Sequence, residues 1–295
     1  MSASNKALWQ DYLELCKPKV VLLMMLTAWV GMLLASPPSF LPLKALTLGS
    51  LGIALTAGSA AIINHIVDRK IDVHMKRTQN RPVAKGRVSP KQATYFSIII
   101  GITGLAILAL LVNVLTACLT FFTLIGYSIV YTIYLKRATP QNIVIGGLAG
   151  ALPPLLGWTA VTNQINPNGL LLVLIIFAWT PPHFWALAIH REQDYRQAQL
   201  PMLPVTHGIP FTKLCIVLYT LLMIITTILP FIFGMSGLPY LISALLLGLL
   251  FLYYAVRLYY IKGPQEKSYA LKTFWFSIFY LMFLFCALLG DHYIK

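Results

Sequence analysis

Two carboxylates and an amide recur at every fourth position of one segment, Asn64-His-Ile-Val-Asp68-Arg-Lys-Ile-Asp72. If this segment is helical, each of the three side chains is rotated by about 40° from the one before, so they share one face at intervals of roughly 6 Å. No Gly or Pro interrupts the chain between Gly58 and Pro82, which favours a continuous helix. A stripe of oxygen donors suits Mg²⁺, which takes one or two carboxylates together with phosphate oxygens.

Basic side chains that could bind phosphate follow the stripe and a later apolar segment: Lys76, Arg77, Arg81, Lys136 and Arg137. Together with the acids, they indicate a diphosphate held by a divalent cation and basic groups. A simpler alternative is that Asp68 and Asp72 only pair with nearby cations at a membrane surface, where ion pairs contribute little. Asn64 argues against that alternative, because a polar group at the edge of an apolar segment is unfavourable without a partner or a task.

A second polar group contains two imidazoles and a carboxylate. At 100° per residue, His183, His190 and Asp194 fall within an arc of about 40°, so a helix here would carry all three on one face. We expect Pro181 and Pro182 to interrupt this helix and line a cavity, because membrane helices tolerate breaks mainly at such places. His183 would then face a flat aromatic ligand, or else be satisfied by a neighbouring helix. Its position alone does not decide between the two.

The composition excludes a water-soluble fold. Hydrophobic residues make up 58% of the 295 residues and charged residues 10%, and the mean hydropathy is +0.77. Apolar windows of about 20 residues, the length that crosses the hydrocarbon core, predict an all-α polytopic protein with nine transmembrane helices in a single domain over residues 1–295. The predicted spans lie near residues 20–36, 46–66, 92–112, 114–134, 142–162, 169–189, 212–233, 238–257 and 271–290.

Positive charge is concentrated on one side of the predicted membrane. All of the 22 Lys and Arg residues except Lys44 and Lys295 fall there. We therefore expect the N-terminus in the cytoplasm and the C-terminus in the periplasm of a bacterial-type inner membrane. This asymmetry, with contact to anionic membrane lipid, explains most of the net charge of +14, so no nucleic-acid partner is implied. Two long cytoplasmic loops, about 67–91 and 190–211, are expected to carry the active site.

The Asn64-xxx-Asp68-xxx-Asp72 stripe resembles the first acidic motif of the UbiA superfamily of intramembrane prenyltransferases. Three further segments are similar to the haem-farnesylating branch of that superfamily: Arg77-Thr-Gln-Asn-Arg81-Pro82, Leu135 to Gly147, and Pro181-Pro182-His183-Phe184-Trp185. The resemblance runs from about Lys17 to the C-terminus and includes the nine-span layout. It implies a UbiA-like bundle that transfers the farnesyl group of farnesyl diphosphate to a vinyl group of haem B, with water added, to give haem O and diphosphate.

The same resemblance implies roles for single residues. Asn64, Asp68 and Asp72 would hold Mg²⁺ and the diphosphate, and Asp194 would carry the second acidic motif. Many members have another acid four residues from that position, whereas this chain has His190 and Ala198 there, so whether one or two metal ions bind stays open. The basic groups assisting the diphosphate would be Arg81, Lys76 and Arg77, with Lys136 and Arg137 beside them. The expected haem and prenyl pocket residues are His183, Trp185 and Tyr131.

Two other functions stay open at this point. A related prenyltransferase would use a quinone precursor or another aromatic acceptor, although the Pro-Pro-His-Phe-Trp segment and the lone Asp194 favour haem. A transporter would also have broken helices and acids near the membrane midplane, but the acids here gather at one membrane edge. A partner protein for haem modification or oxidase assembly is also left open.

Overall fold

The computed structural model of the chain describes residues 8–73, 75 and 78–294, and all regular secondary structure in them is helical, with π-helical turns labelled η. The first part of the chain forms α1 (Trp9–Leu15), α2 (Pro18–Leu34), η1 (Ala45–Gly49), α3 (Ser50–Asp72), α4 (Pro90–Ile107), η2 (Leu108–Val112), α5 (Val114–Ile125), η3 (Gly126–Leu135) and α6 (Lys136–Ala138). The remainder forms α7 (Asn142–Ala151), α8 (Pro153–Thr162), α9 (Pro167–His190), α10 (Glu192–Gln197), α11 (Leu203–Thr206), α12 (Gly208–Ile232), α13 (Leu238–Tyr260) and α14 (Gln265–Ile294).

The membrane spans agree with the hydropathy pattern. Within the described residues, eight helical segments are long and apolar enough to cross a membrane, and α1 with α2, bent by 51° between them, would make a ninth. Large apolar side chains remain exposed along the outer faces, for example Ile99 and Leu110. Such faces suit contact with lipid tails, so the predicted all-α membrane fold is confirmed.

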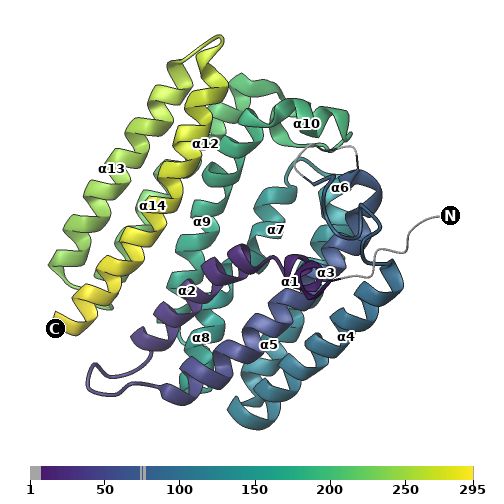
Figure 1. Cartoon of the computed structure of the whole chain (residues 1–295). Helices are drawn as coiled ribbons and strands as arrows, with labels where there is room; N and C mark the ends of the chain where they lie inside the picture. The colour runs from purple at the N-terminus through teal and green to yellow at the C-terminus, as the bar shows by residue number, and fades with distance from the viewer. Residues whose placement is uncertain (1–7, 74, 76–77, 295) are drawn as a thin grey trace.

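The bundle has two distinct ends. The C-terminal end of α3, helices α6 and α10, and the turn between α13 and α14 lie at one end, whereas the α2–α3 connection and the C-terminus lie at the other (Figure 1). Segments 67–91 and 190–211, which carry the predicted acidic residues, therefore meet at the same end of the molecule.

Small residues hold α3 closely against α4. A Cβ atom at Gly104 would lie only 2.7 Å from the carbonyl oxygen of Gly52, and one at Gly101 only 2.7 Å from Ser59 Oγ. The Ser59 hydroxyl also donates to the carbonyl of Ser97 across this interface, at 2.9 Å. Lipid tails are as apolar as the side chains, so membrane helices associate through close packing and hydrogen bonds of this kind. The helix that carries the acidic stripe is thus fixed along its length.

The expected interruption at Pro181 and Pro182 is wrong, because α9 remains helical through both prolines. Another proline pair does mark a break: Pro153 and Pro154 begin α8 directly after α7 ends. Proline removes only its own N–H donor, and a membrane helix tolerates that loss where neighbouring helices surround it. Helices α7, α12 and α14 all pack against α9, and both of its prolines are buried.

Candidate active site

The acidic stripe lies on one continuous helix. Helix α3 extends without a break to Asp72, as the absence of Gly and Pro predicts. Asn64, Asp68 and Asp72 are exposed by only 5%, 0% and 3%. Three polar side chains are therefore buried together at the end of an apolar helix, where each needs a partner.

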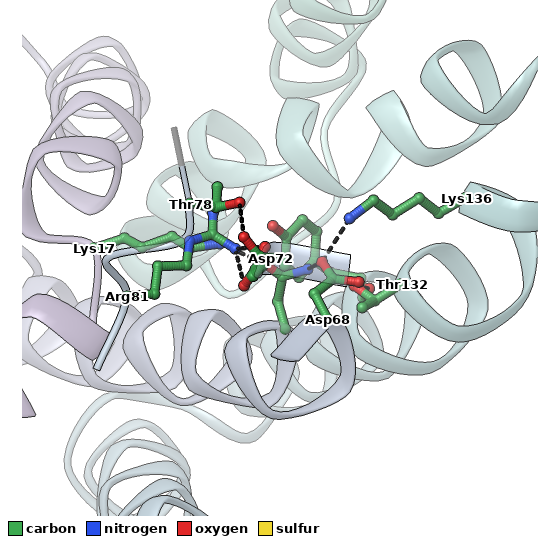
Figure 2. A network of polar contacts seen from close by, with 9 residues as sticks. Lys17, Asp68, Asp72, Thr78, Arg81, Thr132 and Lys136 are labelled. Carbon is green, nitrogen blue, oxygen red and sulfur yellow. Dashed lines mark hydrogen bonds and ion pairs between the residues drawn. The ribbon is translucent and has the colours of Figure 1, made fainter. Parts of the chain in front are cut away.

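Each member of the stripe contacts a cation from a different part of the chain, and Figure 2 shows these contacts around Asp68 and Asp72. Lys136 Nζ lies 2.5 Å from Asp68 Oδ2, and Arg81 Nη1 lies 2.8 and 2.7 Å from the two carboxylate oxygens of Asp72. Lys17 Nζ donates to the amide oxygen of Asn64. Segments far apart in the sequence thus converge on one face of α3.

Lys17 reaches the stripe from the bend between α1 and α2. Its backbone is left-handed, with φ of 50°, which is uncommon for a residue with a Cβ atom. Pro18 begins α2 directly afterwards, and its ring favours an extended conformation rather than a helical one in the residue before it. The bend therefore lets this side chain leave the helix axis and turn toward α3.

Lys136 follows a π-helical segment. In η3 the chain is wound more widely than in an α-helix, and the Thr132 hydroxyl donates to the carbonyl of Tyr127, five residues earlier, at 2.8 Å. This winding changes the direction of the side chains that follow it. Lys136, at the end of η3, points toward Asp68 (Figure 2).

Arg81 is presented by the loop between α3 and α4. The Thr78 hydroxyl donates to the carbonyl of Asp72 at 3.2 Å, and the Arg81 amide donates to the carbonyl of Thr78 at 3.0 Å. The loop therefore turns back over the end of α3. Nearby, Arg87 contacts Asp11 Oδ1 at 2.5 Å and Glu14 Oε2 at 3.0 Å, which ties the same loop to α1.

The two carboxylate oxygens of Asp68 differ in their hydrogen bonding. Asp68 Oδ2 accepts hydrogen bonds from Lys136 and from Asn64 Nδ2, the latter at 2.7 Å, but Asp68 Oδ1 is buried without a hydrogen-bond partner among the described residues. An unsatisfied, charged oxygen is unfavourable in a buried site. The amide oxygen of Asn64 and the carboxylate of Asp72 belong to the same face of α3. These hard oxygen donors fit Mg²⁺, which also takes water and phosphate oxygens, better than a softer metal.

The other residues predicted near the stripe have varied positions. Arg137 is exposed on α6, and the Tyr131 ring packs against Gly146 of α7 and lies 5.6 Å from the Tyr127 ring. Lys76 and Arg77 lie outside the described residues.

His183 is enclosed between aromatic rings in the second region. Its ring stacks on Trp179 and Phe274 at centroid distances of 4.2 and 4.5 Å, and its Nδ1 lies 2.6 Å from Ser277 Oγ. The Ser277 hydroxyl donates to the carbonyl of Phe274, so we assign the proton to Nδ1 of His183 and the lone pair to Nε2. The interhelical partner expected as an alternative is therefore present, while Nε2 keeps a lone pair and can act as an acceptor.

Trp185 is packed inside the bundle. It is only 1% exposed, and its ring meets the Tyr219 ring edge-on at 5.1 Å. Its indole Nε1 has no hydrogen-bond partner among the residues that the structure describes. A role in a haem or prenyl pocket remains a prediction for this residue.

The expected single helical stripe from His183 through His190 to Asp194 is wrong. Helix α9 ends at His190, and Arg191 departs from helical geometry before α10 begins. His190 Nδ1 lies 3.0 Å from the carbonyl of Lys267, so this imidazole ties α9 to α14.

Asp194 lies in α10 and not on the helix of the acidic stripe. Its carboxylate is 3.8 Å from Arg191. In the described part of the chain, no group of three or more His, Cys, Asp or Glu side chains is placed to hold a metal ion. The structure thus groups Asn64, Asp68 and Asp72 with their cations, and the role of Asp194 remains a prediction.

Sequence reasoning did not identify Lys17 as part of the site. Hydropathy marks Lys17 only as one of several basic residues before the first span. The signal that could have identified it is the Lys17–Pro18 pair, because Pro restricts the preceding residue and places a bend at a charged position.

Taken with this geometry, the sequence comparisons define the class of protein: the chain matches the UbiA prenyltransferase family over residues 24–286 and belongs to it. Over 285 residues it is 63% identical to a protoheme IX farnesyltransferase of Legionella pneumophila, covering 97% of this chain and 96% of that protein. It is 60% identical over 293 residues to a protoheme IX farnesyltransferase of Hahella chejuensis, covering 99% and 97%.

Solved structures agree with the fold. A digeranylgeranylglyceryl phosphate synthase superposes with a TM-score of 0.80 at 22% identity, covering 97% of this chain and 99% of the other. A UbiA homolog from Archaeoglobus fulgidus bound to GPP and Mg²⁺ superposes with a TM-score of 0.68 at 19% identity, covering 94% and 99%. At these identities the likeness establishes the shared helical fold.

Proposed function

We propose that this chain transfers the farnesyl group of farnesyl diphosphate to a vinyl group of haem B. The carbon–oxygen bond of the donor breaks, a carbon–carbon bond to the vinyl group forms, and water adds to give the hydroxyethyl group of haem O, with diphosphate and a proton released. The nine spans act together as one domain. The observation that carries the donor half is the buried stripe of Asn64, Asp68 and Asp72, facing cations from three distant segments.

The acceptor is supported by the relatives. Proteins 57–63% identical over nearly the whole chain are named protoheme IX farnesyltransferases. This similarity favours haem over a quinone precursor, and the family favours a prenyltransferase over a transporter. We assign haem contact to His183, because its Nε2 keeps the lone pair that an iron ligand requires.

The basic residues stabilise the leaving group. Lys17, Lys136 and Arg81 now bond the stripe, and in the reaction they turn to the diphosphate oxygens as negative charge develops there. Asn64, Asp68 and Asp72 would hold Mg²⁺, with Asp194 as a further donor, and that ion would neutralise part of the same charge. Arg137, Lys76 and Arg77 add positive charge around this end.

An allylic cation needs surroundings that attract it without attacking it. The rings of Tyr127 and Tyr131 lie on η3, the segment that also presents Lys136. Aromatic faces attract cations and exclude bulk water. We therefore assign Tyr131 to the wall beside the first carbon of the farnesyl chain, with Trp185 on the acceptor side.

We place the active site on the cytoplasmic side of a bacterial-type inner membrane, with the C-terminus in the periplasm. The support is the concentration of Lys and Arg at the end that carries α3 and α10. Replacing the four native cysteines by Ser and introducing Lys262→Cys tests this placement. An impermeant maleimide should label that position in inside-out vesicles and not in intact cells, and the reverse pattern would contradict the orientation.

A direct assay tests the reaction. Purified protein is incubated with haem B, farnesyl diphosphate and Mg²⁺, and the product is identified by the mass of the farnesylated hydroxyethyl porphyrin. A parallel incubation replaces haem B with an aromatic quinone precursor, and a third contains EDTA. A prenylated product from the quinone precursor alone would reject haem as the acceptor, and product formed without divalent metal would reject the metal site.

A further inference from the structure

The histidine next to the stripe, His65, is a polar residue buried inside the bundle. His65 is 2% exposed, and neither Nδ1 nor Nε2 has a hydrogen-bond partner among the described residues. An imidazole carries one N–H donor and one acceptor when neutral. Burying both without partners is unfavourable, so a structural role alone does not account for a polar ring at this position.

The two histidines of α9 are bonded to a neighbouring helix. His183 Nδ1 contacts Ser277, and His190 Nδ1 contacts the carbonyl of Lys267. Both links join α9 to α14. Among the residues that the structure describes, His65 makes no corresponding link, although α3 packs closely against α4. Its N–H donor is therefore open to a ligand.

The location of His65 indicates what that ligand is. Asp72 follows seven residues later, so the two side chains point within about 20° of each other, with His65 roughly 10 Å deeper along α3. Lys17 bonds Asn64, the residue directly before His65, and Arg81 bonds Asp72. An imidazole N–H on the same stretch of α3 as these two cations completes a set of donors for an oxyanion.

We propose that His65 donates a hydrogen bond to an oxygen of the donor diphosphate, from the side facing the membrane interior. This inference rests on the proposed function and adds a substrate-binding residue to it. The prenyl chain is apolar and extends toward that interior, so an N–H donor at the depth of His65 meets the diphosphate near the point where the chain is attached. The hydrogen bond restrains the diphosphate against withdrawal toward water and stabilises charge on it as the bond breaks.

Binding of inorganic diphosphate with Mg²⁺ to the full chain in nanodiscs, measured by calorimetry, tests this role. His65→Phe and His65→Leu remove the donor and should weaken binding about tenfold, the scale of one hydrogen bond to a charged group. His65→Gln and His65→Asn keep an N–H donor, and at least one of them should bind within about threefold of the wild type. Ile62→Ala, at a fully buried position one turn earlier on α3, controls for lost packing and should leave the affinity unchanged.

Steady-state kinetics add a second readout. The donor-free variants should raise the KM for farnesyl diphosphate and leave the KM for haem B unchanged. Equal affinity of wild type and His65→Phe for Mg-diphosphate overturns the inference, as does equal weakening by all four substitutions. A wild-type protein that binds no Mg-diphosphate instead refutes the proposed function, so the two failures are distinguishable.

Ring resonances give a readout if the donor-free variants do not fold. In protein labelled with ¹⁵N-histidine, the His65 signal is the one missing from the His65→Gln spectrum. Addition of Mg-diphosphate should shift its N–H resonance downfield, while the signals of His183 and His190 stay in place. An unmoved His65 signal at saturating Mg-diphosphate overturns the inference.

Discussion

Two groups of charged residues occupy the same end of the bundle, and their bonds differ in kind. On α3, Lys136 and Arg81 reach Asp68 and Asp72 from distant segments, yet Asp68 Oδ1 and the His65 ring nitrogens have no partner in the described part of the chain. The cations there can exchange one set of oxygens for another. Our proposed function assigns a ligand to this region.

The second group, on α10, α12 and α14, connects one helix end to another. Glu192 accepts from Arg196 at 2.5 Å and lies 3.5 Å from Lys267, while Lys213 pairs with Glu266 and donates to the carbonyl of Ile261 at 2.5 Å. Both acidic side chains are engaged on the protein itself. The comparison teaches that buried charge alone does not mark a site, whereas an unsatisfied donor or acceptor beside exchangeable cations does.

The largest effect should follow from Asp68→Asn. This change removes the carboxylate whose free oxygen is the best metal donor, and we expect kcat/KM to fall about 100-fold or more. Glu192→Gln is the matched control, because it neutralises a buried carboxylate of the second group. That control should keep near-normal turnover and lower the Tm by a few degrees. Normal turnover in Asp68→Asn, measured by haem O formation, would rule out the metal site.

Arg81→Ala should have the next largest effect. Losing the guanidinium removes charged hydrogen bonds to the donor, so the KM for farnesyl diphosphate should rise about 10- to 30-fold with a smaller change in kcat. Arg81→Lys keeps the charge without the forked geometry, so its KM for farnesyl diphosphate should lie between those of the wild type and Arg81→Ala. Initial rates at varied donor concentration measure both. An unchanged apparent donor affinity in Arg81→Ala would count against its role.

Lys213→Met should change stability and leave catalysis intact. Lys213 is 3% exposed, so its loss leaves Glu266 without its partner and should destabilise the protein by about 1–3 kcal/mol. The double variant with Glu266→Gln should lose less than the sum of the single changes, because each removes the same pair. Thermal unfolding in detergent gives the stabilities. A matching loss of haem O formation at permissive temperature would mean that the second group also serves the reaction.

Arg87→Ala should give the smallest effect. Its side chain is 35% exposed, and pairs of that kind contribute about 0.2–1 kcal/mol. We expect faster proteolysis near α1. The KM for farnesyl diphosphate should rise no more than about threefold, because α1 only helps to position Lys17, which follows it in the chain. Glu14→Gln removes the charge of the more exposed of the two partners of Arg87, so its KM for farnesyl diphosphate and its rate of proteolysis should be closer still to those of the wild type. A tenfold rise in KM for either variant would mean that α1 contacts the substrate itself.

Much of this architecture follows from simple sequence rules. Span lengths follow from apolar runs of bilayer thickness, and the helical stripe from Asn64 to Asp72 follows from four-residue spacing without Gly or Pro. These features depend only on residues within one short segment, so the sequence of that segment is enough to predict them.

The pairings are not local. Lys17 meets Asn64 through a left-handed bend, and Lys136 meets Asp68 after a π-helical segment that no four-residue rule describes. The failed expectations have the same origin. Pro181 is tolerated because three helices surround α9, and the arc ending at Asp194 fails because the backbone changes direction at Arg191. In each case tertiary context outweighs the periodicity of one segment.

The glycine contacts between α3 and α4 have a kinetic consequence. Backbones that meet at Gly52 and Gly104 leave no room for one helix to slide past the other without a steric clash. Admission of the prenyl donor must then proceed by rotation of the long lysine and arginine side chains at the stripe, rather than by slower collective shifts of the transmembrane helices. Loading of the donor is thereby uncoupled from helix motion, and turnover is left to be limited by bond making or by escape of the bulky, poorly soluble product into the bilayer.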